Sequence, residues 1–204
     1  MQIREPAIVC AVRPHGETAG IVRLLTADHG LVAGYVAGAR GRNLRPVLIP
    51  GNLVEAELRS RSASQLPFAR LELVQSRGPW LSEPLPAAAI GWVTALAAAT
   101  LPERHAYPAL YEALSALLEA VCVAPSARRW AVPLVSFEVL LLRELGYGVS
   151  TARPADGDWQ AALDAFDKVG GQLERYLLAE RRSDVMAARA MLGTRLKRIE
   201  GSVE

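Results

Sequence analysis

The chain has 204 residues, 51% of them hydrophobic, and a formal net charge of +2. This apolar content excludes an intrinsically disordered chain, and the length allows one large domain or two small ones. The charge is uneven: residues 1–80 hold ten arginines and six acidic residues, whereas residues 81–204 hold thirteen basic and fifteen acidic ones. A surface that faces a polyanion is therefore expected in the first third of the chain.

Five segments in the first 75 residues alternate apolar and polar residues or are rich in β-branched ones, which is typical of strands. They are residues 6–13, 18–25, 31–37, 52–61 and 67–75. Turn residues, including Gly16 and Gly30, separate the first three of them. Five short strands with turns between them predict a small closed or partly closed barrel.

Residues 38–46, Gly-Ala-Arg-Gly-Arg-Asn-Leu-Arg-Pro, place Arg40, Arg42 and Arg45 among turn and loop formers. A guanidinium offers a planar fork of donors to phosphate, and glycine lets a backbone approach closely. We therefore predict a short, flexible, phosphate-binding loop held out into water. The alternative, equally weighted on charge alone, is a solvated connector whose arginines only keep it soluble.

Four further arginines lie on the predicted strands and are candidates for the same surface: Arg23, Arg59, Arg61 and Arg70. The last three would share an outer face near the loop. The alternative is that these are ordinary exposed strand charges, some of them paired with nearby carboxylates at Glu55, Glu57 and Glu72.

A change of composition at residues 76–79, followed by Pro84 and Pro86, marks a domain boundary, which we place between 1–78 and 79–204. Beyond it, apolar residues recur at helical spacing over 90–101, 108–121 and 126–145. Pro133 indicates either a bend in the third helix or its first turn. A short helix over 159–166, ending before Gly170 and Gly171, and helical runs over 172–178 and 184–199 follow. Residues 84–102 carry no charge but are rich in alanine, which predicts a buried helix and not a membrane span.

The patterns of common catalytic and metal sites are missing from the sequence. It holds no GxxxxGK[ST], GxSxG or HExxH motif, and its three histidines lack ligand spacing. Cys10 and Cys122 lie far apart in apolar segments, which predicts buried free thiols. We expect a binding protein and not an enzyme, with no cofactor and no metal. The N-terminus lacks the plan of a signal peptide, which favours the cytoplasm.

Short matches spread over nearly the whole chain resemble, in the same order, the bacterial recombination mediator family RecO. In the first part they are Gly16-Glu17-Thr18, Leu24-Leu25-Thr26 with Gly30, Ala37-Gly38-Ala39-Arg40 and Leu48-Ile49-Pro50. In the second part they are Phe137-Glu138, Leu140 to Leu142, Leu145-Gly146-Tyr147-Gly148 and Arg181-Arg182-Ser183.

This resemblance implies an N-terminal OB-fold and a C-terminal helical domain, an α+β chain of two domains. It also implies binding to single- and double-stranded DNA and annealing of complementary strands in the cytoplasm, at the nucleoid. The implied partners are the mediator RecR, the acidic C-terminal tail of the single-strand-binding protein and, indirectly, the RecA recombinase. Many members of the family carry a cysteine cluster where this chain has Val-Ser-Thr-Ala-Arg at 149–153, so no zinc site is expected.

An OB-barrel usually assists phosphate contacts with aromatic side chains that stack on bases. Only Tyr35 and Phe68 precede Trp80, and we expect Phe68 to lie in the core. Binding is then expected to depend on the DNA backbone, to be indifferent to sequence and to weaken strongly with salt.

For the partner tail we consider an apolar groove rimmed by arginine on the helical domain. The candidates are Phe137, Leu141 and Arg143, with Arg128 and Arg129 nearby, although Phe137 and Leu141 read more simply as core. Two other functions stay open: a protein–protein adaptor without DNA contact, and an RNA-binding OB protein.

Overall fold

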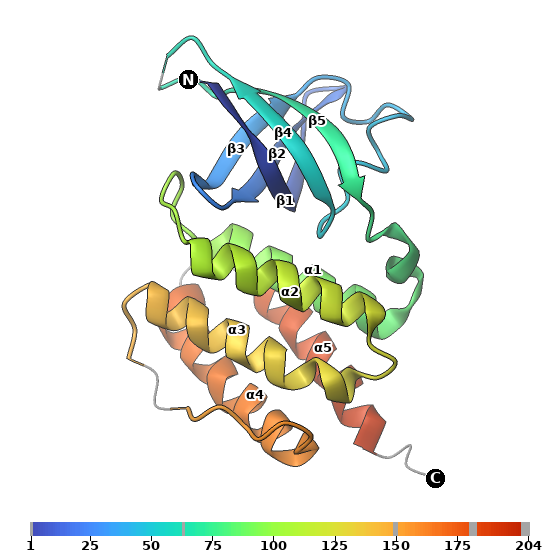
Figure 1. The fold of residues 1–204 in the computed structure, drawn as a ribbon, viewed down its shortest axis with the longest axis vertical. Helices are drawn as coiled ribbons and strands as arrows, with labels where there is room; N and C mark the ends of the chain where they lie inside the picture. The colour runs from blue at the N-terminus through green and yellow to red at the C-terminus, as the bar shows by residue number, and fades with distance from the viewer. Residues whose placement is uncertain (1, 63, 149–150, 180–182, 201–204) are drawn as a thin grey trace. The chain divides into compact units, whose positions relative to one another are not determined.

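The computed structural model describes residues 2–62, 64–148, 151–179 and 183–200. Five strands, coloured from dark blue to green in Figure 1, close into a barrel in the order β1-β2-β3-β5-β4. They are β1 (Gln2–His15), β2 (Ala19–Thr26), β3 (Gly30–Val36), β4 (Leu53–Arg59) and β5 (Phe68–Gln75). The predicted five-stranded barrel is therefore confirmed.

Strand β1 closes the barrel because it is long enough to pair with two other strands, β4 and β2. Its first half pairs with β4, where Ile3 lies opposite Leu58, and its second half pairs with β2, where Val12 lies opposite Val22. An irregularity between Val9 and Ala11 shifts the register of the pairing with β2, as a β-bulge does when it bends a strand. The sequence pattern predicted only residues 6–13 of this strand, which has 14 residues.

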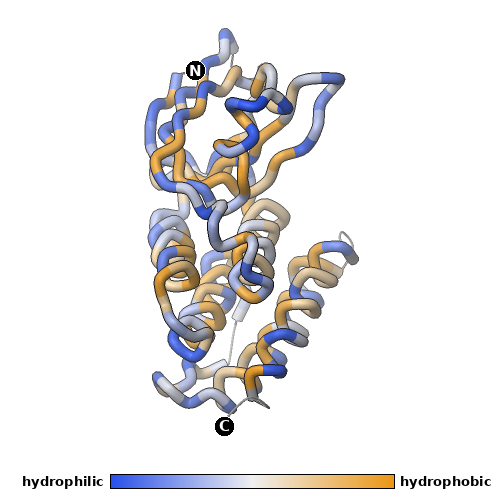
Figure 2. Tube along the Cα trace, turned by 90° about the vertical axis from the view of Figure 1, so that its right-hand side faces the viewer, coloured by the Kyte–Doolittle hydropathy of each residue, from blue (hydrophilic) through white to orange (hydrophobic). Residues whose placement is uncertain are grey.

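Alternate residues of the strands fill the barrel, and Figure 2 shows this alternation of hydrophilic and hydrophobic positions along the chain. Buried side chains from every strand form one cluster, which includes Ile3, Val22, Val32, Val54 and Leu71. Because side chains fill its interior, the barrel is a packed core and binding has to occur on its outer surface.

Helices follow the barrel. They are a 3₁₀ turn η1 (Gly78–Ser82), α1 (Pro84–Thr100), α2 (Pro108–Val123), η2 (Ala127–Arg129), α3 (Ala131–Glu144), α4 (Trp159–Leu173), the π-helical turn η3 (Glu174–Leu178) and α5 (Ser183–Glu200). None of the helices in the described part of the chain has the length and apolar content needed to cross a membrane.

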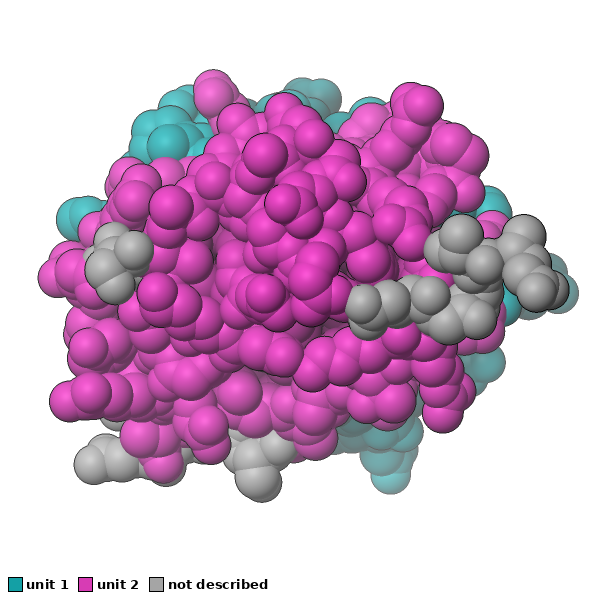
Figure 3. Space-filling view, turned by 90° about the horizontal axis from the view of Figure 1, so that it is seen from below, with its two compact units in different colours: residues 1–82, 94–111 teal, residues 83–93, 112–204 magenta. Residues whose placement is uncertain are grey.

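Two compact units divide the chain, one of residues 1–82 and 94–111 and the other of residues 83–93 and 112–204, coloured separately in Figure 3. Helix α1 contributes its first part to the second unit and its last part to the first. The barrel unit thus includes residues well beyond the composition change at residue 78.

Helix α3 begins at Ala131 and not at 126, so that of the two alternatives for Pro133 the first-turn position holds, and it ends at Glu144, just before Gly146. Pro133 lies in the first turn, where its missing N–H leaves no hydrogen bond unmade. At the other end Gly146 has a φ of +86°, the Gly146 amide donates to the Arg143 carbonyl, and the Tyr147 amide donates to the Leu142 carbonyl. This is the Schellman pattern, and glycine is favoured there because a Cβ would strain the left-handed conformation.

Helix α4 is longer than predicted. It continues to Leu173 through Gly170 and Gly171, where the sequence suggested that it would end. The reason lies in packing: a Cβ on Gly170 would lie 2.1 Å from Nη1 of Arg189, so this glycine makes room for a side chain of α5.

Candidate nucleic-acid interface

The segment after β3, residues 38–46, folds into successive hydrogen-bonded turns. Gly38 adopts a φ of +64°, and the Gly41 amide donates to its carbonyl at 2.8 Å. The amides of Leu44 and Arg45 then both donate to the Gly41 carbonyl at 3.1 Å. The backbone is thus tied by its own hydrogen bonds, in contrast to the flexible loop that the sequence suggested.

Apolar residues fix this loop to the barrel. Leu44, Val47 and Leu48 pack against the core cluster. A Cβ on Gly20 of β2 would lie 3.0 Å from the Cβ of Ala39, which shows how closely the loop approaches that strand. The charged residues between these contacts, Arg40, Arg42 and Arg45, are exposed to solvent.

Asn52, which is fully buried, fixes the end of the loop with its side chain. Its Nδ2 donates to the carbonyls of Pro46 and Val47 at 2.8 and 3.0 Å, and its Oδ1 accepts from the Arg77 amide at 2.7 Å. One side chain therefore links the loop to the segment that follows β5.

The three loop arginines are all exposed. Arg45 donates from Nε to the Arg40 carbonyl at 2.9 Å, which holds the two residues together. Among the residues that the structure describes, no carboxylate forms an ion pair with Arg40, Arg42 or Arg45. An anchored loop thus presents three guanidinium groups that the barrel itself does not neutralise.

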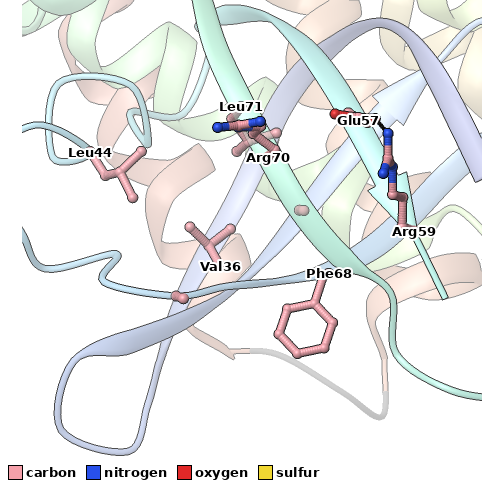
Figure 4. A pocket seen from close by; sticks show the side chains of 9 residues that line it. Val36, Leu44, Glu57, Arg59, Phe68, Arg70 and Leu71 are labelled. Atoms are coloured by element: carbon pink, nitrogen blue, oxygen red, sulfur yellow. Dashed lines mark hydrogen bonds and ion pairs between the residues drawn. The ribbon is translucent and has the colours of Figure 1, made fainter.

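Beside this loop, the outer face of the barrel has a groove of about 470 Å³. Figure 4 shows its labelled side chains: Leu44 from the loop, Val36 from the end of β3, and Glu57 and Arg59 from β4 opposite Phe68 and Arg70 from β5. The register explains the set, because Arg59 lies opposite Phe68 and Glu57 lies opposite Arg70 across the strand pair.

A second groove, of about 630 Å³, lies next to the first, at the connection between β4 and β5. It is lined by Arg59, Ser60, Arg61, Gln65, Leu66 and Phe68. Arg59 and Phe68 border both grooves. Arg59 and Arg70 thus line the first groove, which adjoins the loop through Leu44, and Arg59 and Arg61 line the second.

The expectation that Phe68 lies in the core is wrong, because its side chain is 66% exposed. Phe68 is the first residue of β5 and shares its side of the strand with Arg70 and Glu72, while Leu71 faces the core. Strict alternation along 68–72 predicts this exposure, although the hydrophobic character of the ring alone favours the core. The ring contacts Tyr35 edge-on, with centroids 5.2 Å apart.

Two of the predicted arginines already have partners. Arg23 forms an ion pair with Glu103 at 3.1 Å and donates to the Ala98 carbonyl, so it serves the packing of its own unit. Arg59 forms an ion pair with Glu57 of the same strand. Neither Arg61 nor Arg70 forms an ion pair within the described ranges, and both are exposed.

In the helical unit, Phe137 and Leu141 are buried, so they belong to the core and cannot line a surface groove. They point inward because they share the apolar stripe of α3, whereas Arg143 lies on the exposed side. A groove of about 280 Å³ does lie beside α3, lined by Val135, Ser136, Val139, Leu140, Arg143, Thr151 and Arg153. The Thr151 hydroxyl, buried at its edge, has no hydrogen-bond partner among the described residues.

The other helical candidates lie elsewhere. Arg128 and Arg129 are exposed on η2, and the Arg128 guanidinium stacks 5.0 Å from the centroid of the Trp159 ring. Neither lines the groove beside α3. Arg181 and Arg182 lie outside the described residues. Within the described part of the chain, no cluster of His, Cys, Asp or Glu has the geometry to hold a metal ion.

Comparisons with known proteins support a DNA-repair context. The family description "Recombination protein O N terminal" matches residues 1–77, and "Recombination protein O C terminal" matches residues 82–190. Among curated relatives, the DNA repair protein RecO of Rhodospirillum centenum is 43% identical over 150 residues, which cover 73% of this chain and 58% of the relative. That of Phenylobacterium zucineum is 40% identical over 157 residues, covering 76% of this chain and 63% of the relative.

The DNA repair protein RecO of Caulobacter vibrioides (strain NA1000 / CB15N) is 38% identical over 169 residues, which cover 82% of this chain and 65% of the relative. The matched part of this chain thus spans between 58% and 65% of the length of these three relatives.

Proposed function

Because the chain belongs to the Recombination protein O family, we propose that it is a DNA-binding recombination mediator without catalytic activity of its own. Its barrel binds the sugar–phosphate backbone of single- and double-stranded DNA through Arg40, Arg42 and Arg45. The observation that carries this proposal is the exposed, anchored loop whose three guanidinium groups have no carboxylate partner in the described chain. Phosphate is the ligand that such a set fits best.

The same arrangement gives a physical route to annealing. Contacts to phosphate position a strand without reading its bases. Two complementary strands whose charges are screened on one protein surface repel each other less, and their base edges stay free to pair. Annealing therefore needs no bond-breaking step and no cofactor.

We further propose that the helical unit recruits proteins: a RecR-like mediator, and the acidic, apolar C-terminal tail of the single-strand-binding protein, with RecA loading as the indirect result. The groove beside α3 suits the tail because Val135, Val139 and Leu140 give it an apolar wall. Arg143 and Arg153 also line the groove and supply positive charge. Apolar side chains would enter the groove and the terminal carboxylate would meet the arginines. This groove replaces Phe137 and Leu141 as the proposed contact.

The decisive experiment measures binding of single-stranded DNA, duplex DNA and structured RNA at several salt concentrations. If the three loop arginines and one further arginine each neutralise a phosphate, log K against log salt should have a slope of about −3 on single strands. The Arg40→Ala/Arg42→Ala/Arg45→Ala variant should reduce that slope to about −1 and bind far more weakly at low salt.

An Arg143→Ala/Arg153→Ala variant is the matched control, since it also removes exposed arginines but leaves the loop intact. It should retain DNA binding and lose binding of a peptide with the sequence of the tail. The loop variant should lose DNA binding and retain binding of the peptide. Unchanged affinity and slope in the loop variant would refute the loop as the site. A protein without polyanion affinity would be an adaptor, and a preference that follows the 2′-hydroxyl would indicate an RNA-binding protein.

A further inference from the structure

Phe68 is exposed in an unusual setting. Large apolar side chains on β5 are also exposed at Leu73 and Val74, but neither of these lines either of the two grooves described above. Phe68 instead borders both grooves on the arginine-rich face. An aromatic ring left in water among cations is the arrangement that proteins use to bind bases of single-stranded nucleic acid.

The ring already has an aromatic neighbour before any ligand arrives. Phe68 lies opposite Tyr35 of β3 on one side and opposite Arg59 of β4 on the other. The Tyr35 ring meets it at an interplanar angle of 76°, and His15 meets Tyr35 at 87° with centroids 5.9 Å apart. Because these contacts order the row His15–Tyr35–Phe68, less side-chain entropy is lost when a base stacks on it.

Each groove also has a cation of its own. Arg70 borders the groove of about 470 Å³ and Arg61 borders the groove of about 630 Å³. Neither forms an ion pair within the described ranges, whereas Arg59 between them is paired with Glu57. The Phe68 ring thus separates two spaces, each larger than a nucleobase and each flanked by an arginine that no described carboxylate neutralises.

We propose that Phe68 stacks on unpaired bases, one in each groove, while Arg61 and Arg70 bind the flanking phosphates. This inference rests on the proposed function and deepens it, because it says how the barrel distinguishes single strands from duplex. Bases of a duplex are stacked on each other and paired, so the ring has no free face to bind unless the duplex is opened at a cost. The loop arginines bind the phosphates of both forms of DNA, whereas Phe68 stacks only on the bases of the single strand.

The test compares Phe68→Ala with the unmodified chain on single-stranded and duplex DNA. Loss of stacking should weaken single-strand binding about 10- to 100-fold and change duplex binding less than about twofold. The salt slope on single strands should stay the same, because no charge is removed. A single-stranded oligonucleotide with 2-aminopurine should change its fluorescence on binding the unmodified chain and much less with the variant.

Two further variants separate stacking from a merely apolar contact or a folding defect. Phe68→Trp should keep single-strand affinity and Phe68→Leu should lose it. Val74→Ala removes a similarly exposed side chain of β5 that borders neither groove, and it should leave both affinities unchanged. Thermal unfolding of each variant checks that the barrel is intact.

Equal single-strand affinity of Phe68→Ala and the unmodified chain, or equal losses on single strands and duplex, would overturn the stacking role. So would a Phe68→Leu variant that binds as well as Phe68→Trp. These outcomes leave the loop proposal standing as long as the loop variant still loses DNA binding. If the unmodified chain binds no DNA at all, both proposals fall together.

Discussion

Glu138 and Arg189 form a buried, two-pronged ion pair in the helical unit. Nε of Arg189 donates to Oε1 of Glu138 at 3.0 Å and Nη2 donates to Oε2 at 2.7 Å. The two residues are 0% and 5% exposed. Nε1 of Trp92 also donates to Oε1, at 2.7 Å, and the guanidinium lies 3.6 Å from the centroid of the Phe166 ring. One network thus links α1, α3, α4 and α5.

Removal of either partner should strongly destabilise the chain, because the other charge would be left buried and unpaired. We expect Glu138→Ala or Arg189→Ala to lower the free energy of unfolding by about 3–5 kcal/mol. Lys197→Ala, which breaks the exposed pair with Asp167, is the control and should cost at most about 1 kcal/mol. Urea unfolding measures all three, and similar losses for the buried and exposed pairs would contradict the prediction.

The adjacent glycines of α4 should respond to alanine in opposite directions. A Cβ at Gly170 would lie 2.1 Å from Nη1 of Arg189, so Gly170→Ala must push the guanidinium away from Glu138. A Cβ at Gly171 meets nothing within 4 Å. We expect Gly171→Ala to stabilise the chain by about 0.5–1 kcal/mol through helix propensity. We expect Gly170→Ala to destabilise it, as measured by thermal and urea unfolding, and equal signs would be evidence against the packing role of Gly170.

Asn52 should affect DNA binding although it carries no charge. Asn52→Ala deprives two loop carbonyls and the buried Arg77 amide of their Asn52 partner, at a cost of about 2–3 kcal/mol. It also frees the end of the loop, so DNA affinity should fall. The slope of log K against log salt should become less steep, because fewer phosphates are contacted. Asn43→Ala, at an exposed position of the same loop, is the matched control and should do neither. Normal DNA binding by Asn52→Ala would mean that the loop does not need this anchor.

Burial raises the pKa of the Cys10 thiol from 9.0 to about 12, although its contact with the Leu25 backbone and the charge of Arg23 act in the opposite direction. Above pH 9 the unfolded chain releases this proton and the folded chain keeps it, so stability falls as pH rises. One such thiol contributes about 1.4 kcal/mol per pH unit between the two pKa values. Below pH 9 the group contributes no pH dependence.

The unfolding free energy of Cys10→Ala should therefore decline less between pH 9 and pH 10.5 than that of the unmodified chain. Thiol titration supplies a second measurement: Cys10 and Cys122 are both buried and should react with a thiol reagent only after unfolding. Parallel pH curves for the two proteins would show that Cys10 ionises in the folded state as easily as in the unfolded one.

The barrel could be predicted because each strand carries its own local pattern. Val54, Ala56 and Leu58 alternate with Glu55 and Glu57, and this spacing alone decides which side faces the core. The start of α2 at Pro108 and the end of α3 before Gly146 could be predicted for the same reason, since a single residue fixes the backbone conformation at each of them. By contrast, the end of α4 was predicted wrongly, because the space for Gly170 is defined by Arg189 on another helix.

The candidate site divides in the same way. The loop with Arg40, Arg42 and Arg45 could be found in the sequence, since three guanidinium groups among turn formers are close to each other whatever the rest of the chain does. The sequence does not show which strand arginines are free to bind phosphate, because Arg23 and Arg59 meet their carboxylate partners only in the folded chain. The exposure of Phe68 follows from local alternation, but its setting between two grooves comes from three strands that folding brings together.

The sequence by itself determined the family, the five-stranded barrel followed by helices, and the loop that carries the arginines, because these depend on neighbours along the chain. Only the tertiary structure decided which charges are neutralised, that two grooves meet at Phe68, and which carboxylate is buried. The physical reason is that desolvation and ion pairing depend on groups brought together from distant positions, such as Glu138 and Arg189, and a linear pattern does not contain those distances.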